Sequence, residues 1–205
     1  MCGIVGYIGK QDAYPILIKG LQRLEYRGYD SAGIALIHNG NLNVYKAKGK
    51  VADLVHFAAQ KDISGNIGIA HTRWATHGEP NQKNAHTHYS QSEELAIINN
   101  GIIENYLKLK QKLEKKGYEF VSETDTEVLA HLLDYYYQGN PLQAITKVMH
   151  RVEGSYALGI MFQDHPDELY AVRKDSPLIV GETENGCVIA SDVPAVLKYT
   201  RDVYF

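Results

Sequence analysis

Short runs of apolar residues, bounded by glycine, asparagine and aspartate, recur through the first hundred positions of the chain. Alternating or briefly continuous apolar residues over four to eight positions are typical of strands. The pattern predicts early strands at residues 3–9, 32–38, 42–47, 65–72 and 94–100. Later runs at hairpin-like spacing predict antiparallel strands at residues 155–162, 168–174, 176–182 and 186–192, with a further strand at the last residues, 201–205.

Between these two groups of strands, apolar residues recur at intervals of three and four, which predicts helices. The stretch 102–117 places one apolar stripe opposite a row of lysines and ends at a glycine. The next stretch, 122–139, begins with a capping pattern, because Thr124 stands three residues before Glu127. Further helices are predicted at residues 14–26 and 141–154.

Strands at both ends of the chain and helices in the middle favour an α+β fold. Its sheets would pack on each other and its helices would cover the outside. The pattern does not fix the order of the strands. With 205 residues and no linker-like stretch, the chain is expected to form one domain, residues 1–205.

Composition narrows the possible partners. A net charge of −3 gives no general reason to bind nucleic acid or an anionic membrane. The lysines of 102–117 alternate with apolar positions and lack interleaved aromatic residues, so they are interpreted as a solvated face. No apolar run approaches the roughly 20 residues that cross a bilayer. Only two cysteines occur, Cys2 and Cys187, which fits a reducing, cytoplasmic location.

Cys2 directly follows the initiator methionine. Removal of Met1 would leave a residue that carries both a thiol and an α-amine, whose ordinary pKa is about 7.7–8.0. Such an amine can take the thiol proton directly or through one water, which would make the sulfur a nucleophile. The alternative is a packed or merely exposed terminal cysteine.

The stretch 71–80, "HTRWATHGEP", leaves a predicted strand and has the composition of a loop. Arg73 could hold a carboxylate through two parallel hydrogen bonds, and Trp74 beside it suggests a lid over a ligand. The alternative is a surface ion pair with the tryptophan packed on the body of the protein. The histidines of this region could also suggest a metal site, but ligand spacing is not evident and no metal is expected; they are His71, His77, His86 and His88.

Three further features carry a functional and a structural interpretation. Asn100 and Gly101 stand where a strand is expected to turn into a helix, so they could supply two donors to an oxyanion or simply form a turn. Asp125 could accept an ammonium or only stabilise the helix that begins there. Arg27 and Asp30 could pair and fix a glycine-rich connection.

Six motifs occur together along the chain. They are "MCGIVGYIG", "LEYRGYDSAGIA", "GIAHTRWATHGEP", "NAHTH", "NNGIIENY" and "SETDTEVLAHLL". Together they resemble the glutamine amidotransferase domain of the N-terminal nucleophile class, and among these domains the glutaminase domains of the glucosamine-6-phosphate synthase family. "SPLIVG" and "IASD" fit the later strands of that family. The resemblance implies a four-layer α-β-β-α sandwich of two antiparallel sheets, the N-terminal nucleophile hydrolase fold.

The resemblance also implies a role for each candidate residue. Cys2, as the first residue of the mature chain, would attack the side-chain amide of L-glutamine to form a γ-glutamyl thioester, and would release ammonia and then glutamate. Asn100 and Gly101 would stabilise the oxyanion. The residues implied to bind or support the substrate are Arg73 for the α-carboxylate, Asp125 for the α-ammonium, Trp74, Thr76 and His77 in a closing loop, and Arg27 beside the nucleophile.

For the complete protein, the resemblance implies a C-terminal sugar-phosphate isomerase domain that this chain lacks, fructose 6-phosphate as ammonia acceptor and an oligomer. No cofactor is implied. The sequence departs from the family pattern at Asn99 and Thr87, where the family usually has histidine and proline. Amidophosphoribosyltransferase and asparagine synthetase are competing families. A glutamine-sensing module without turnover and a metal-binding regulator are the alternatives from other classes.

Overall fold

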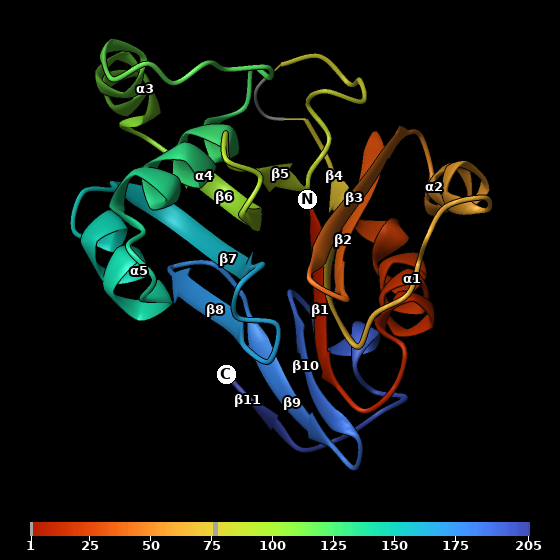
Figure 1. The fold of residues 1–205 in the computed structure, drawn as a ribbon. Coiled ribbons are helices and arrows are strands. Elements are labelled where there is room, and N and C mark those ends of the chain that lie inside the picture. The colour runs from red at the N-terminus through yellow and green to blue at the C-terminus, as the bar shows by residue number, and fades with distance from the viewer. Residues whose placement is uncertain (1, 76–77) are drawn as a thin grey trace.

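Two antiparallel sheets face each other, and helices cover the outer face of each sheet (Figure 1). The structure is a computed structural model that describes residues 2–75 and 78–205. The seven-stranded sheet has the order β11-β9-β10-β1-β4-β2-β3. Its strands are β1 (Gly3–Gly9), β2 (Ser31–His38), β3 (Asn41–Lys48), β4 (Ile67–Arg73), β9 (Ile179–Thr183), β10 (Gly186–Ala190) and β11 (Val203–Tyr204).

The second sheet has four strands in the order β5-β6-β7-β8. They are β5 (His88–Tyr89), β6 (Leu95–Ile103), β7 (Gly154–Phe162) and β8 (Leu169–Lys174). Helices α1 (Ala13–Leu24) and α2 (Val51–Ala58) lie against the larger sheet. The smaller sheet is covered by α3 (Tyr106–Lys115), α4 (Asp125–Tyr136) and α5 (Pro141–Met149). This arrangement is the predicted α-β-β-α sandwich.

Three apolar cores hold the four layers together, because alternate side chains of a strand point to opposite faces of its sheet. Along β1, Ile4 belongs to the core between the two sheets and Val5 to the core under α1. The core between the sheets also contains Ile69 of β4, Ile98 of β6 and Met161 of β7. A third core joins the smaller sheet to α3, α4 and α5. All these side chains are buried, and the apolar contacts between the sheets hold the two sheets packed face to face.

The boundary between β6 and α3 differs from the sequence prediction. The predicted helix 102–117 begins only at Tyr106, because Ile102 and Ile103 continue β6 and pair with Ser155 and Gly154 of β7. Short apolar runs fit strand and helix alike, and here the partner strand decides. Helix α2 was not predicted, although its buried residues, Val51, Leu54 and Ala58, follow helical spacing.

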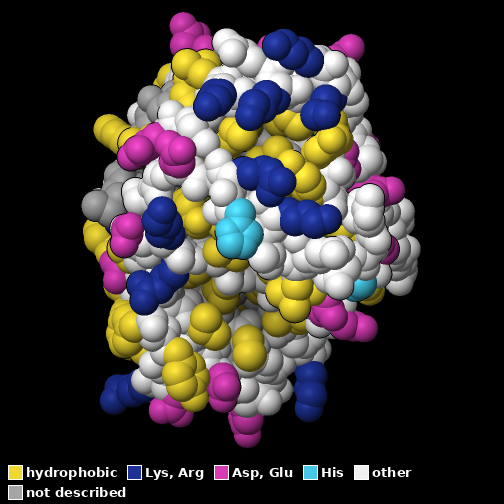
Figure 2. All heavy atoms as spheres, turned by 90° about the vertical axis from the view of Figure 1, so that its left-hand side faces the viewer, with side chains coloured by type: hydrophobic (Ala, Val, Ile, Leu, Met, Phe, Trp, Pro, Cys, Tyr) yellow, Lys and Arg dark blue, Asp and Glu magenta, His cyan; other side chains and the backbone are white. Residues whose placement is uncertain are grey.

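Most other predicted elements are confirmed within a few residues. Thr124 caps α4, since its Oγ1 accepts the backbone N–H of Glu127 at 3.4 Å. The lysines of α3 lie towards solvent, and Leu109 and Leu113 are buried beneath them. Figure 2 views the molecule from the side of α3, α4 and α5 and shows lysine and arginine side chains gathered around exposed apolar ones. Among the described helices, none combines the length and apolarity needed to span a bilayer.

Candidate active site

Cys2 directly precedes β1, near the centre of the larger sheet. β1 pairs with β4 in the register Gly3 with Thr72, so the segment that follows β4 passes beside the cysteine. The backbone N–H of Trp74 donates to Cys2 Sγ at 3.1 Å. Burial raises the pKa of the Cys2 thiol, and the Trp74 N–H only partly opposes this effect. The Cys2 thiol therefore loses its proton less readily than an ordinary cysteine thiol.

Asn100, on β6 of the smaller sheet, contacts the backbone of Cys2. Its Nδ2 donates to the backbone carbonyl of Cys2 at 2.9 Å. His71 lies on the other side of this amide, with Nε2 at 3.0 Å from Asn100 Oδ1 and 2.9 Å from the backbone carbonyl of Asn99. Burial lowers the pKa of His71 to about 3, so its imidazole is neutral. A side-chain amide donor is thus held beside the candidate nucleophile.

The turn interpretation of Asn100 and Gly101 is wrong, because both residues lie inside β6 and pair with β7. Gly101 nevertheless has a φ of 129°, which side-chain-bearing residues rarely adopt. A Cβ at this position would lie 2.1 Å from the backbone oxygen of Ser155. Glycine is therefore required here by both the backbone angle and the neighbouring strand.

Arg73 is the last residue of β4 and is 3% exposed. Its guanidinium donates to the backbone carbonyls of Gly78 and Glu79, each at 3.2 Å. The carboxylate of Asp30 lies 3.9 Å from the same group and also accepts the backbone N–H of Ala75. Arg73 and Asp30 therefore tie both described ends of the 74–79 segment to the body of the protein.

The ion pair of Asp30 described above joins it to Arg73 rather than to Arg27. Arg27 instead lies 3.9 Å from Asp192 and donates to the backbone and hydroxyl oxygens of Ser191 at 3.3 and 3.4 Å. The Ser191 hydroxyl accepts the backbone N–H of Ile4 at 2.9 Å. Arg27 therefore supports the strand that carries Cys2 through one intervening side chain.

Asp125 is the first residue of α4 and is 3% exposed. Its Oδ2 accepts the backbone N–H of Ile103 at 2.9 Å, two residues beyond Gly101 on β6. The carboxylate therefore stabilises the start of the helix and also faces the strand that carries the oxyanion candidates.

Trp74 is 54% exposed and its ring lies against Gly28, where a Cβ would approach to within 2.8 Å. This position beside the thiol fits a covering residue. Thr76 and His77 lie outside the described residues.

The remaining histidines of the motif region form a buried row. The ring of His86 lies 4.1 Å from that of His71 and 4.8 Å from that of His88, centroid to centroid. His88 Nε2 lies 2.9 Å from the hydroxyl of Thr124, at the start of α4. In residues 2–75 and 78–205, no three His, Cys, Asp or Glu side chains are grouped so that they could hold a metal ion. The contact of His71 with Asn100 was not predicted from the sequence, because it joins strands of two different sheets.

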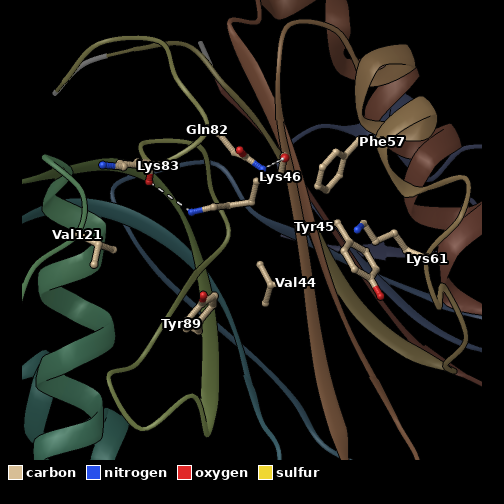
Figure 3. Close-up of a pocket in the computed structure, with 9 residues that line it drawn as sticks. All are labelled: Val44, Tyr45, Lys46, Phe57, Lys61, Gln82, Lys83, Tyr89 and Val121. Carbon is tan, nitrogen blue, oxygen red and sulfur yellow. Dashed lines mark hydrogen bonds between the residues drawn. The ribbon is translucent and has the colours of Figure 1, made fainter.

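A separate cavity of about 400 Å³ lies between β3, α2 and the segment around residues 82–89 (Figure 3). Lys46 extends across it and donates to the backbone carbonyl of Lys83 at 3.3 Å. Burial lowers the pKa of Lys46 to about 8. Of the candidate site residues that the structure describes, none lines this cavity, so it is separate from Cys2 and its described contacts.

Comparison with known proteins identifies the family of this chain. Residues 71–198 match the family model described as a glutamine amidotransferase domain. The fold is that of the amidotransferases with the N-terminal nucleophile hydrolase fold, and the chain belongs to the glutamine amidotransferase domain family.

Its whole length is 60% identical to part of a glutamine–fructose-6-phosphate aminotransferase (isomerizing) from Caldanaerobacter subterraneus and 58% identical to part of one from Clostridium acetobutylicum. The chain spans 34% of the length of each of these relatives. Among solved structures it is similar to the Bacillus subtilis glutamine phosphoribosylpyrophosphate amidotransferase, with a TM-score of 0.84 and 30% identity over 95% of this chain and 43% of that one.

Proposed function

We propose that Cys2, exposed as the first residue by removal of Met1, hydrolyses the side-chain amide of L-glutamine. The α-amine takes the thiol proton, and the sulfur bonds to the amide carbon to give a tetrahedral oxyanion. The amine then returns its proton to the departing nitrogen, so ammonia leaves and a γ-glutamyl thioester remains. Water, deprotonated by the same amine, cleaves the thioester to give glutamate and the free thiol.

The observation that carries this proposal is the contact between Asn100 Nδ2 and the Cys2 carbonyl. It places an amide donor beside the residue whose sulfur attacks. Together with the backbone N–H of Gly101, this amide would stabilise the oxyanion, and removal of one such donor typically lowers kcat by roughly 10²–10³. The raised pKa of the half-buried Cys2 thiol supports the need for the α-amine as base.

Arg73 and Asp125 are proposed to select the backbone end of glutamine. This end carries one negative and one positive charge, and both side chains are buried and of opposite sign to the groups they would bind. Arg73 would exchange its contacts with the carbonyls of Gly78 and Glu79 for the α-carboxylate. Trp74, Thr76 and His77 would cover the bound substrate, and Arg27 would support the strand behind Cys2.

The relatives suggest where the ammonia goes. Both are named for fructose 6-phosphate, and each is about three times as long as this chain. We propose that residues 1–205 form one domain that supplies ammonia to a sugar-phosphate isomerase domain in a longer, oligomeric cytoplasmic protein, which makes glucosamine 6-phosphate. A full-length protein that releases ammonia without aminating this sugar phosphate would contradict the assignment.

The test of the Cys2 mechanism is a glutaminase assay on purified protein whose intact mass shows whether Met1 has been removed. Cys2→Ala is expected to lose measurable release of glutamate, because no other group replaces the sulfur. Cys187→Ala, which removes the other free thiol, is the matched control and is expected to keep wild-type activity. An active Cys2→Ala variant, or full activity with Met1 retained, would exclude the mechanism. Saturable glutamine binding without turnover by the wild type would favour a sensing module.

A further inference from the structure

We propose that His71 is a positioning residue that fixes which end of the Asn100 amide faces the nucleophile. This inference rests on the proposed function, since Asn100 is taken as an oxyanion donor. His71 does not contact the sulfur in the described structure. Its contacts are with the backbone oxygen of Asn99 and the side-chain oxygen of Asn100.

The first step concerns the tautomer of His71. Its Nε2 lies 2.9 Å from the Asn99 carbonyl oxygen, and a carbonyl oxygen can only accept a hydrogen bond. Nε2 must therefore carry the ring hydrogen. This requirement comes from the main chain and would be met by any residue at position 99, so the departure from the family pattern at Asn99 leaves it intact.

The second step concerns the Asn100 amide. The same Nε2–H also points at Asn100 Oδ1, at 3.0 Å. If the amide were rotated by 180°, its NH₂ group would face the Nε2–H, and its oxygen would face the Cys2 carbonyl oxygen. Both contacts would be repulsive, whereas in the observed orientation both are hydrogen bonds. The Asn99 carbonyl thus sets the tautomer of His71, and the tautomer sets the orientation of the amide.

The third step is the consequence for catalysis. An asparagine amide has two N–H bonds, and in this orientation one of them goes to the Cys2 carbonyl. The second N–H remains on the side of the nucleophile for the oxyanion of the substrate. Donation from His71 to the amide oxygen also polarises the amide and makes its N–H groups stronger donors.

Rigid surroundings hold this chain of contacts in place. His71 is fully buried on β4, opposite Ile4 of β1, and the two asparagines lie on β6 of the other sheet. The ring of His86 packs against it at 4.1 Å between centroids. Because burial keeps His71 neutral, its effect is on geometry and polarity, without proton transfer.

The test compares three variants with the wild type in the glutaminase assay. His71→Phe keeps a buried ring without a donor and is expected to lower kcat about 10- to 100-fold, with KM for glutamine changed less than about threefold. His71→Gln keeps an N–H at a similar distance from the backbone and is expected to recover most of the loss. Thr72→Val, a nearly isosteric change at the next buried position, is the matched control and is expected to keep wild-type kcat.

A double-mutant cycle with Asn100→Ala separates positioning from general damage. If His71 acts through the Asn100 amide, His71→Phe costs less than about twofold once that amide has been removed. The pH dependence of kcat is expected to keep its shape in His71→Gln, since no proton transfer is lost.

An equal loss from His71→Phe in both backgrounds, or an unchanged kcat in the single variant, would overturn the proposal. Failure of the proposed function would appear separately, as a wild-type protein that does not hydrolyse glutamine.

Discussion

Several side chains of the candidate site form hydrogen bonds with backbone groups of nearby segments. The sulfur of Cys2 accepts a hydrogen bond from the Trp74 N–H, and the guanidinium of Arg73 donates hydrogen bonds to the carbonyls of Gly78 and Glu79. These contacts link Trp74 to the candidate nucleophile Cys2, and the adjacent Arg73 to residues 78–79. A substrate carboxylate that binds Arg73 would therefore also break the hydrogen bonds between Arg73 and residues 78–79.

At this scale the sharpest test is Arg73→Lys. Lysine keeps the charge but cannot make two parallel hydrogen bonds to a carboxylate, so kcat/KM for glutamine is expected to fall about 10- to 100-fold. The control substrate is the α-amide of glutamine, which lacks the carboxylate. With it, variant and wild type should differ by less than about threefold. Equal losses on both substrates would show that Arg73 acts only by holding residues 78–79.

Among the elements, β6 carries the Asn100 amide and also contacts α4 through Ile103 and Asp125. The strand can pass this point only with glycine at position 101, where the backbone angle and the oxygen of Ser155 both exclude a side chain. The backbone of residues 100–103 therefore connects the oxyanion candidates, Asn100 and Gly101, to the substrate-binding candidate Asp125.

Gly101→Ala tests this steric requirement. Its control is Gly117→Ala, because Gly117 also has a positive φ but no neighbouring atom that an added Cβ would meet. Gly117 has a φ of 93° with no neighbour within 4 Å of an added Cβ, so Gly117→Ala should lower the free energy of unfolding by about 1–2 kcal/mol from strain alone. Gly101→Ala should lower it by at least about 2 kcal/mol more, because the strand must shift. Denaturant unfolding measures both, and equal losses would contradict the steric argument.

Across the whole molecule, a buried polar row accompanies the apolar cores. The rings of His71, His86 and His88 pack against one another from β4 to β5, at tilted and edge-on angles, and His88 lies within hydrogen-bond distance of the hydroxyl that caps α4. Burial lowers the pKa of all three histidines, so they are neutral in the folded protein at ordinary pH. The row therefore links the two sheets to the helix that carries Asp125 without adding net charge.

This row predicts acid sensitivity. Above the ordinary histidine pKa of about 6.5, the three groups are neutral in both states and stability is fully present. Below that value the unfolded chain binds protons that the folded protein excludes, so stability falls with decreasing pH, down to about pH 3 in the case of His71.

Each such histidine contributes up to about 1.4 kcal/mol per pH unit. Unfolding in urea between pH 7.5 and 5 measures the slope. His86→Phe, whatever its effect at pH 7.5, should make that slope shallower. A slope of zero in the wild type would contradict the neutral row.

The sequence alone determined most elements, the α+β class and, through its motifs, the family and the set of candidate residues. It did so because these features depend on local periodicity, on capping such as that of Thr124, and on residues grouped in short stretches. The order of the strands, the position of Asn100 and Gly101 inside β6, and the pairing of Asp30 with Arg73 were decided only by tertiary structure.

The same holds for the contact of His71 with Asn100, which joins strands of two different sheets across 29 positions of sequence. The sequence thus identifies the chemical groups of the candidate site. Their orientation depends on which strands pair and pack, because the free energy of these contacts comes from residues far apart in the sequence.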